Sequence, residues 1–240
     1  DEGYDRFTMP LYGGFDGLDI TEQDPFNNTR ALQAGKTETT GYAYNSVKRA
    51  IDSIADPEEV EFNLASMPGL LNTDLQDHLI NICEDRGDAL AIVDLEGGYT
   101  ASHENTQSIS DRLGSSNTTI TNLRDRQLNT SYACAYYPWV QVKDTINDNY
   151  VWVPPSVIAM GALSFSENQT ELWFAPAGFT RGGLTQGAGG LPVLQARERL
   201  TAEQRDRLYE ANINPIATFP AEGIVIFGQK TLQVTQSALD

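Results

Sequence analysis

The chain has 240 residues, of which 40% are hydrophobic and 9% aromatic, and its formal net charge is −17. These values are typical of a globular chain with ample core in one large domain or two small ones, and they exclude an intrinsically disordered protein. A surface this acidic repels phosphate backbones, so nucleic acid is not an expected partner. The chain has no run of 18 apolar residues, the length that a membrane span requires, so a membrane is not an expected partner either. The charge serves solubility alone, or it places carboxylates opposite basic patches on partner subunits.

The first 40 residues favour turns. Residues 1–40 therefore predict a loop-rich N-terminal segment, and residues 41–240 are expected to form an α/β domain. Asp16, Asp19 and Asp24 could gather around calcium, but their spacing matches no EF-hand loop. Acidity of surface turns is the better interpretation of these three aspartates.

The next segment has the pattern of a βαβ unit. Apolar spacings of three and four predict a helix over residues 41–55, and alternation predicts a strand over residues 60–65. Thr73 is the expected N-cap of a second helix, which ends at Gly87. Residues 89–95 are continuously apolar, as in a strand that is covered on both faces. The order strand, helix, strand predicts a parallel pair.

A polar stretch separates this unit from a set of strands. Residues 97–122 are rich in Ser, Thr and Asn, and we expect a helix near residues 106–113 followed by a looser stretch. A strand is predicted over residues 132–137, and residues 139–142 continue it after a bend. After a turn, residues 150–153 form a returning strand.

The last third alternates helices and strands. Pro154-Pro155-Ser156 is expected to open a helix, because proline suits the first helical turn. Residues 175–190 carry six glycines and are expected to be mobile. A capping-box spacing predicts a helix over residues 201–212, and strands are predicted over residues 215–219 and 223–227. The inner face of the helix after the two prolines is expected to consist of Val157, Met160, Gly161 and Phe165.

Catalysis by a serine–histidine–acid triad would depend on one of two histidines. The chain has no Gly-x-Ser-x-Gly nucleophile elbow. His78 lies on the polar flank of the second helix beside Asp77, where a solvated residue is the simpler interpretation. His103 follows a strand, and strand ends in α/β sheets host sites, although loop decoration is the simpler interpretation. An α/β hydrolase-like enzyme with a site at His103 or His78 is the alternative function.

Binding without catalysis leaves further alternatives. A small anion could bind at a helix N-terminus near Thr73 or Ser156. Cys83 and Cys134 are expected to be two buried thiols instead of a disulfide, and they are too few for a cysteine-rich zinc site. No catalytic, cofactor-binding or metal-binding residue is therefore expected.

The three tryptophans share a strand-like, proline-flanked setting. Aromatic clusters can be platforms for ligands, but anchoring in the core or in an interface is the better interpretation here. The three residues are Trp139, Trp152 and Trp173.

A series of motifs in a fixed order runs through residues 11–232. Each motif is weak alone, and the ordered series is specific. In this order the motifs resemble the tail sheath proteins of contractile-tailed bacteriophages. The motifs are Gly13-Gly14-Phe-Asp-Gly17, Met67-Pro68-Gly69, Ile92-Val93-Asp94, Tyr136-Tyr-Pro-Trp139, Val153-Pro-Pro-Ser156, Ala159-Met-Gly161, Trp173-Phe-Ala-Pro-Ala-Gly178, Leu200-Thr-Ala-Glu203, Asn214-Pro-Ile216, Phe219-Pro220 and Gly228-Gln-Lys-Thr-Leu232.

The resemblance implies an α/β fold of mixed α+β character, with a mixed sheet flanked by helices and no enzymatic activity, cofactor or metal. It implies a structural subunit of a viral contractile tail sheath, a helical polymer around the tail tube whose contraction drives the tube through the host cell envelope for genome ejection. The implied partners are other sheath subunits, the tail tube and the baseplate. The implied location is the virion tail, after assembly in the host bacterial cytoplasm.

The family's chains normally begin before a point like Asp1 and continue past a point like Asp240 with arms that add strands to neighbouring sheets. This chain is therefore expected to lack both arms and to be a monomer or a weak oligomer on its own. Head-to-tail contacts that do not close would generate the helical polymer of the parent.

Overall fold

The computed structural model describes residues 37–235 except residues 103, 105–107, 172 and 187–190. Of the predicted loop-rich segment, only residues 37–40 are described, and they form a turn closed by a 2.9 Å hydrogen bond from Thr40 N to Thr37 O. Asp16, Asp19 and Asp24 lie outside the described residues, so neither interpretation of these aspartates is tested. None of the described helices combines the length and apolarity that crossing a membrane requires.

Two sheets organise the fold. The larger sheet has five strands in the order β1-β2-β3-β7-β8, with the first four parallel and β8 antiparallel to β7. The smaller sheet has three antiparallel strands in the order β5-β4-β6. The strands are β1 (Leu64–Ser66), β2 (Leu90–Val93), β3 (Ala133–Tyr137), β4 (Val140–Asp144), β5 (Asn149–Val153), β6 (Val193–Ala196), β7 (Asn214–Phe219) and β8 (Gly223–Ile226).

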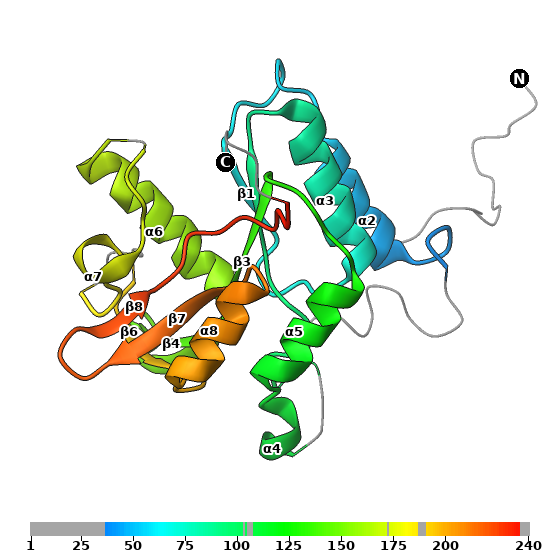
Figure 1. The fold of residues 1–240 in the computed structure, drawn as a ribbon. Coiled ribbons are helices and arrows are strands. Elements are labelled where there is room, and N and C mark those ends of the chain that lie inside the picture. The colour runs from blue at the N-terminus through cyan, green and yellow to red at the C-terminus, as the bar shows by residue number, and fades with distance from the viewer. Residues whose placement is uncertain (1–36, 103, 105–107, 172, 187–190, 236–240) are drawn as a thin grey trace, which may run out of the picture.

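Helices cover both faces of the larger sheet. In Figure 1, α2 and α3 lie together on the right of the sheet, and α6 and α7 lie on the left. The described helices are α2 (Tyr42–Asp52), α3 (Thr73–Arg86), α4 (Ile109–Arg112), α5 (Ser116–Asp125), α6 (Pro155–Gln169), α7 (Gly178–Arg181) and α8 (Ala202–Glu210). The expected α/β fold with a mixed sheet flanked by helices is confirmed.

Alternate side chains of the central strands enter two separate cores. On β2, Ala91 and Val93 join a core built with α2, α3, α5 and α8, whereas Ile92 joins a second core built with α6 and the smaller sheet. Because a strand that feeds two cores needs apolar residues on both faces, it has the continuous apolar run that the sequence shows. The predicted βαβ unit is confirmed, with β1 and β2 parallel.

The boundaries of the βαβ unit differ from the prediction at two points. The strand predicted over residues 60–65 begins only at Leu64. The N-cap of α3 is Asn72 instead of Thr73, because the Asn72 side chain accepts a 3.0 Å hydrogen bond from Leu75 N. Gly87 ends the helix with φ of 71°, as the sequence predicts.

The polar stretch is more helical than the sequence suggests. The short helix near residues 106–113 is α4, and the expected looser stretch contains α5. Ser115 caps α5 by accepting a 3.2 Å hydrogen bond from Thr118 N. Ile120 and Leu123 bury the inner side of α5 in the first core, which explains why a segment so rich in serine and threonine is helical.

Helix α6 turns a different face to the sheet than predicted. Phe165, expected on the inner face, is 44% exposed. The buried face instead uses Ile158, Ala159 and Ala162, because small side chains let the helix approach β1, β2 and β3 closely. The full set of buried residues on this helix is Pro155, Ser156, Ile158, Ala159, Ala162 and Ser166.

The glycine-rich segment packs on β8 over its described part. Leu184 is fully buried and donates a 2.8 Å hydrogen bond to Ile224 O, and Gly183 forms an antiparallel bridge with Val225. Gly182 is required by close approach, since a Cβ there would lie 2.5 Å from Ile226 O. Within the segment predicted to be mobile, residues 182–185 are thus hydrogen-bonded to β8.

The remaining strands and the last helix follow the sequence closely. Residues 139–142 do continue as β4, but in the smaller sheet, where β5 is the predicted returning strand. The capping box of α8 is present, with Gln204 N donating to Thr201 Oγ1 at 3.2 Å and Thr201 N donating to Gln204 Oε1 at 2.8 Å. Strands β7 and β8 match the last two predicted strands, whereas β6 has no counterpart in the prediction.

Candidate assembly surface

Asp94, just past the end of β2, is where an α/β sheet would place a functional group. It is 1% exposed, and its Oδ2 accepts hydrogen bonds from Gly69 N at 2.8 Å and from Ser156 Oγ at 2.7 Å. Its Oδ1 accepts from Ser156 N at 3.2 Å. Burial raises the pKa of Asp94, and the hydrogen bonds from Gly69 and Ser156 oppose that rise. The carboxyl group therefore ties the β1–α3 loop to the start of α6.

Gln76 completes this buried network. Its Nε2 donates to the carbonyl oxygens of Leu70 and Asp94, both at 2.7 Å, and its Oε1 accepts from Arg126 Nη1 at 2.8 Å. The polar groups at this strand end thus satisfy one another, which is the arrangement of a structural link between elements.

The alternative of an anion site at a helix N-terminus fits neither position. At the start of α6, the Asp94 carboxyl group already accepts hydrogen bonds from the Ser156 amide and hydroxyl. At the start of α3, the Asn72 side chain caps the helix. Both helix N-termini are therefore occupied by groups of the chain itself.

His78 joins two helices on the surface. Its Nε2 lies 2.6 Å from Asp52 Oδ1, at the end of α2, and among the described residues no serine shares a hydrogen bond with it. His103 lies outside the described residues. The structure therefore assembles no triad around His78, and it leaves the prediction for His103 untested.

The two cysteines lie in different cores. Cys83 belongs to the first core and Cys134 to the second, on opposite faces of the larger sheet, and both thiols are free. Burial raises the pKa of Cys83 to about 11 and that of Cys134 to about 12, so both are protonated at neutral pH. Within the described residues, no three His, Cys, Asp or Glu side chains are grouped as metal ligands would be.

The tryptophans have different environments. Trp139 is 7% exposed and packs edge-on against Tyr99, with ring centroids 5.2 Å apart. The ring centroid of Trp152 lies 5.8 Å from that of Tyr99, and the Arg197 guanidinium stacks over the Trp152 ring, 5.5 Å from its centroid. Trp173 is 78% exposed, so core anchoring is wrong for this residue and an interface remains open.

An exposed group of aromatic side chains gathers around α7 and the β7–β8 hairpin. The rings of Phe179, Phe219 and Phe227 contact one another, with centroids 4.9, 5.2 and 5.5 Å apart. Phe179 is 51% exposed and Phe227 is 40% exposed. Exposing a cluster of aromatic rings to water does not stabilise a monomer, and exposed apolar patches of this kind mark interaction surfaces. We call the aromatic face the residues Phe165, Trp173, Phe174, Phe179, Phe219 and Phe227 with Arg181 and Arg205.

Two arginines lie on the aromatic face, and one carboxylate, that of Glu222, lines the cavity beside it. Arg181 stacks over Phe174 at 4.1 Å, and Arg205 stacks over Phe219 at 5.0 Å. Among the described residues, neither guanidinium forms an ion pair with a carboxylate. A cavity of about 660 Å³ opens beside Arg181. It is lined by Phe165, Phe179, Arg181, Thr185, Pro220 and Glu222, among others.

A second exposed surface lies on the α2–β1 connection. Residues 52–61 hold five carboxylates and no basic residue. We call residues 56–61 the acidic loop; its side chains Asp56, Glu58, Glu59 and Glu61 are all exposed.

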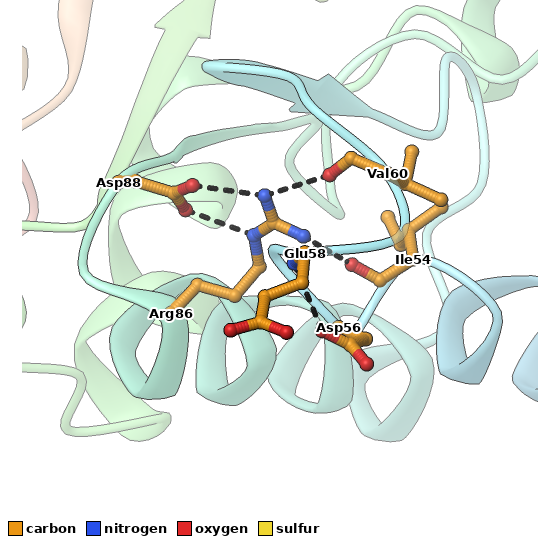
Figure 2. Close-up of polar contacts among 6 residues, drawn as sticks. All are labelled: Ile54, Asp56, Glu58, Val60, Arg86 and Asp88. Atoms are coloured by element: carbon orange, nitrogen blue, oxygen red, sulfur yellow. Dashed lines mark hydrogen bonds and ion pairs between the residues drawn. The ribbon is translucent and has the colours of Figure 1, made fainter.

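The guanidinium of Arg86 lies between Asp88 and the carbonyls of Ile54 and Val60 (Figure 2). Its Nη1 donates to Ile54 O at 2.7 Å, just before the loop, and its Nη2 donates to Val60 O at 3.0 Å, near the end of the loop. The same group forms a two-pronged ion pair with Asp88 at 2.8 and 2.9 Å, and it stacks over Phe62 at 4.1 Å. The hydrogen bonds from Arg86 lower the pKa of Asp88. The acidic loop is therefore held in one conformation by these contacts.

Comparison with known proteins gives the context for these surfaces. The family model of the phage tail sheath protein central domain matches residues 40–232. The tail sheath protein of Enterobacteria phage T4 is 26% identical over 239 residues, which cover 95% of this chain and 35% of that protein. The tail sheath protein of Vibrio phage KVP40 is 27% identical over 227 residues, covering 93% of this chain and 29% of that protein. The chain thus spans about a third of the length of these curated relatives.

Solved structures show the same fold. The contracted helical sheath of the anti-feeding prophage matches with a TM-score of 0.50 and 21% identity, covering 86% of this chain and 47% of that chain. The contracted PVC sheath complex of an extracellular contractile injection system matches with a TM-score of 0.52 and 19% identity, covering 78% of this chain and 45% of that chain.

Proposed function

This chain belongs to the phage tail sheath family, and from that premise we propose that it is the central part of a structural subunit of a contractile tail sheath. The observation that carries the proposal is the family match over residues 40–232, which includes every described helix and strand. The aromatic face supports it, because exposed rings next to arginines that form no ion pair within the described part of the chain suit contact with other proteins. We take residues 41–240 as one α/β domain of that subunit.

The proposed work is mechanical. Subunits polymerise helically around the tail tube, and contraction of the sheath drives the tube through the host cell envelope for genome ejection. The partners are other sheath subunits, the tail tube and the baseplate, and the protein is a component of the virion tail that assembles in the host bacterial cytoplasm. Two cores on either side of one sheet give a body stiff enough to transmit force between neighbours.

The chain performs this role without catalysis. The buried carboxyl of Asp94 bonds to Gly69 and Ser156, and His78 bonds to Asp52, so these groups support the fold. Burial of apolar surface between subunits supplies the driving force, at roughly 25 cal/mol per Å² before the costs of association.

Electron microscopy of the complete protein tests the proposal. The complete protein, expressed alone and negatively stained, should form long hollow tubes of stacked rings. A complete protein that stays dispersed as small particles at high concentration, with or without the tail tube protein added, would contradict the proposed function.

A further inference from the structure

The two exposed surfaces of this chain differ in electrostatic character. The acidic loop and the end of α2 carry five carboxylates without a basic residue. Residues 178–235, which contain most of the aromatic face, hold six basic and five acidic residues, whereas the whole chain holds 16 and 33. This part of the chain is therefore close to neutral and carries Arg181 and Arg205 on the aromatic face, whereas the chain as a whole is strongly acidic.

The two surfaces also lie on different sides of the molecule. In Figure 1 the α2–β1 connection forms the loop at the top of the view, above α3, whereas α7 and the β7–β8 hairpin lie at the lower left. A surface and its complement on different sides of one body join copies head to tail. Such contacts generate open helical polymers when the rotation does not close.

Resting on the proposed function, we infer that the acidic loop of one copy docks on the aromatic face of the next copy. The chemistry matches on both sides. Arg181 and Arg205 lack carboxylate partners among the described residues, and the loop offers four exposed carboxylates. Pro57, exposed in the middle of the loop, supplies an apolar ring for contact with the phenylalanines. Charge complementarity of this kind fixes the register of a contact and excludes wrong partners.

The Arg86 clamp gives the inferred contact its rigidity. Because the guanidinium holds the carbonyls of Ile54 and Val60, the loop is already ordered before it docks, and docking does not carry the entropy cost of ordering it. On the other side, the rings of Phe179, Phe219 and Phe227 already pack on one another. Both surfaces are therefore formed before they meet.

Disulfide trapping in the complete protein tests this inference. The probe residues are Glu59→Cys in the acidic loop and Thr180→Cys beside Phe179, both at exposed positions. The natural Cys83 and Cys134 are buried and do not compete. After mild oxidation, the double variant should give a ladder of cross-linked oligomers on a non-reducing gel, and a mixture of the two single variants should give dimers. Neither single variant alone should cross-link.

Charge reversal gives a second readout. In the double-cysteine variant, the further changes Arg181→Glu and Arg205→Glu should abolish the ladder. Adding Glu58→Arg and Glu61→Arg to that same chain should restore it. The matched control is Arg124→Glu, at an exposed arginine on α5, and it should leave the ladder intact. Tubes from the complete protein without any ladder would overturn the inference and leave the proposed function standing. Absence of both tubes and ladder would contradict both. Homodimers of one single variant, or cross-links only to a different polypeptide, would also overturn the inference.

Discussion

Ser156 donates two hydrogen bonds to Asp94, from its hydroxyl at 2.7 Å and from its backbone amide at 3.2 Å. The two residues are 62 positions apart in the sequence, and both are almost fully buried. This pair fastens α6 to the end of β2. It lies at the carboxyl end of a parallel strand, where open α/β sheets bind ligands, and here it stabilises the fold.

Removing the Ser156 hydroxyl should weaken the fold. The variant Ser156→Ala leaves the buried carboxyl of Asp94 short of one donor, and we expect a loss of about 1–3 kcal/mol in the free energy of unfolding. Chemical denaturation measures it. Ser166→Ala is the matched control on the same helix, because the buried Ser166 hydroxyl has no hydrogen-bond partner among the described residues. The free energy of unfolding of Ser166→Ala should be unchanged or slightly higher, because this variant removes a buried hydroxyl without a partner among the described residues. Equal losses in the two variants would contradict the role of the pair.

The raised pKa of Asp94 predicts a pH dependence. Because burial raises its pKa in the folded state, the folded protein binds this proton more tightly than the unfolded chain does. The contribution of Asp94 to stability is therefore largest at pH values below its unfolded pKa of about 3.9, and it declines as pH rises through the folded pKa. Asp94→Asn cannot titrate. The stability difference between the native chain and this variant should shift against the native chain as pH rises, and a difference independent of pH would count against a raised pKa.

Gly182 and Gly183 differ in the space around them. A Cβ at Gly182 would lie 2.5 Å from Ile226 O, whereas a Cβ at Gly183 would meet nothing within 4 Å. We expect Gly182→Ala to lower the free energy of unfolding by about 1–3 kcal/mol, because the chain segment must move off β8. Gly183→Ala should be neutral or slightly stabilising. Thermal unfolding of both variants checks this, and equal tolerance would show that the segment is not held against β8.

Arg86 should control the order of the acidic loop. In the variant Arg86→Ala, the carbonyls of Ile54 and Val60 lose their shared donor. Hydrogen exchange of the backbone amides between these two residues should accelerate by on the order of tenfold or more, because local opening no longer breaks these hydrogen bonds. Arg49→Ala, at an exposed position on α2, is the control and should leave exchange unchanged. Unchanged exchange in both variants would show that the loop is ordered without the clamp.

Local patterns were enough to predict much of the fold. The apolar run before Asp94 indicates a strand between two layers, and the spacing of Thr201 and Gln204 indicates the start of α8. Both signals lie within a few residues of the feature that they predict. The N-cap at Asn72 was missed by one position, since the adjacent Thr73 is also a good capping residue.

Features that depend on distant partners could not be read in the same way. Strand β6 is held by pairing with β4, about 50 residues earlier in the chain, and only one of its four residues is buried, so no apolar alternation marks it. The buried face of α6 follows from the small residues that fit against the sheet, whereas hydrophobicity alone favoured Phe165.

The aromatic face could not be predicted from the sequence either. Its rings come from α6, α7, the end of β7 and the segment after β8, and no spacing relates them. The only local sign is Trp173-Phe174, an aromatic pair outside any helix or strand. The surface exists only after the fold has brought these segments together.

Cryo-electron microscopy of tubes assembled from the complete protein tests the central claim most directly. The account predicts a helical reconstruction in which residues 37–235 fit as one body and the aromatic face is buried against a neighbouring copy. A complete protein that forms no helical assembly, or a lattice in which α7 and the β7–β8 hairpin face solvent in every copy, would contradict it.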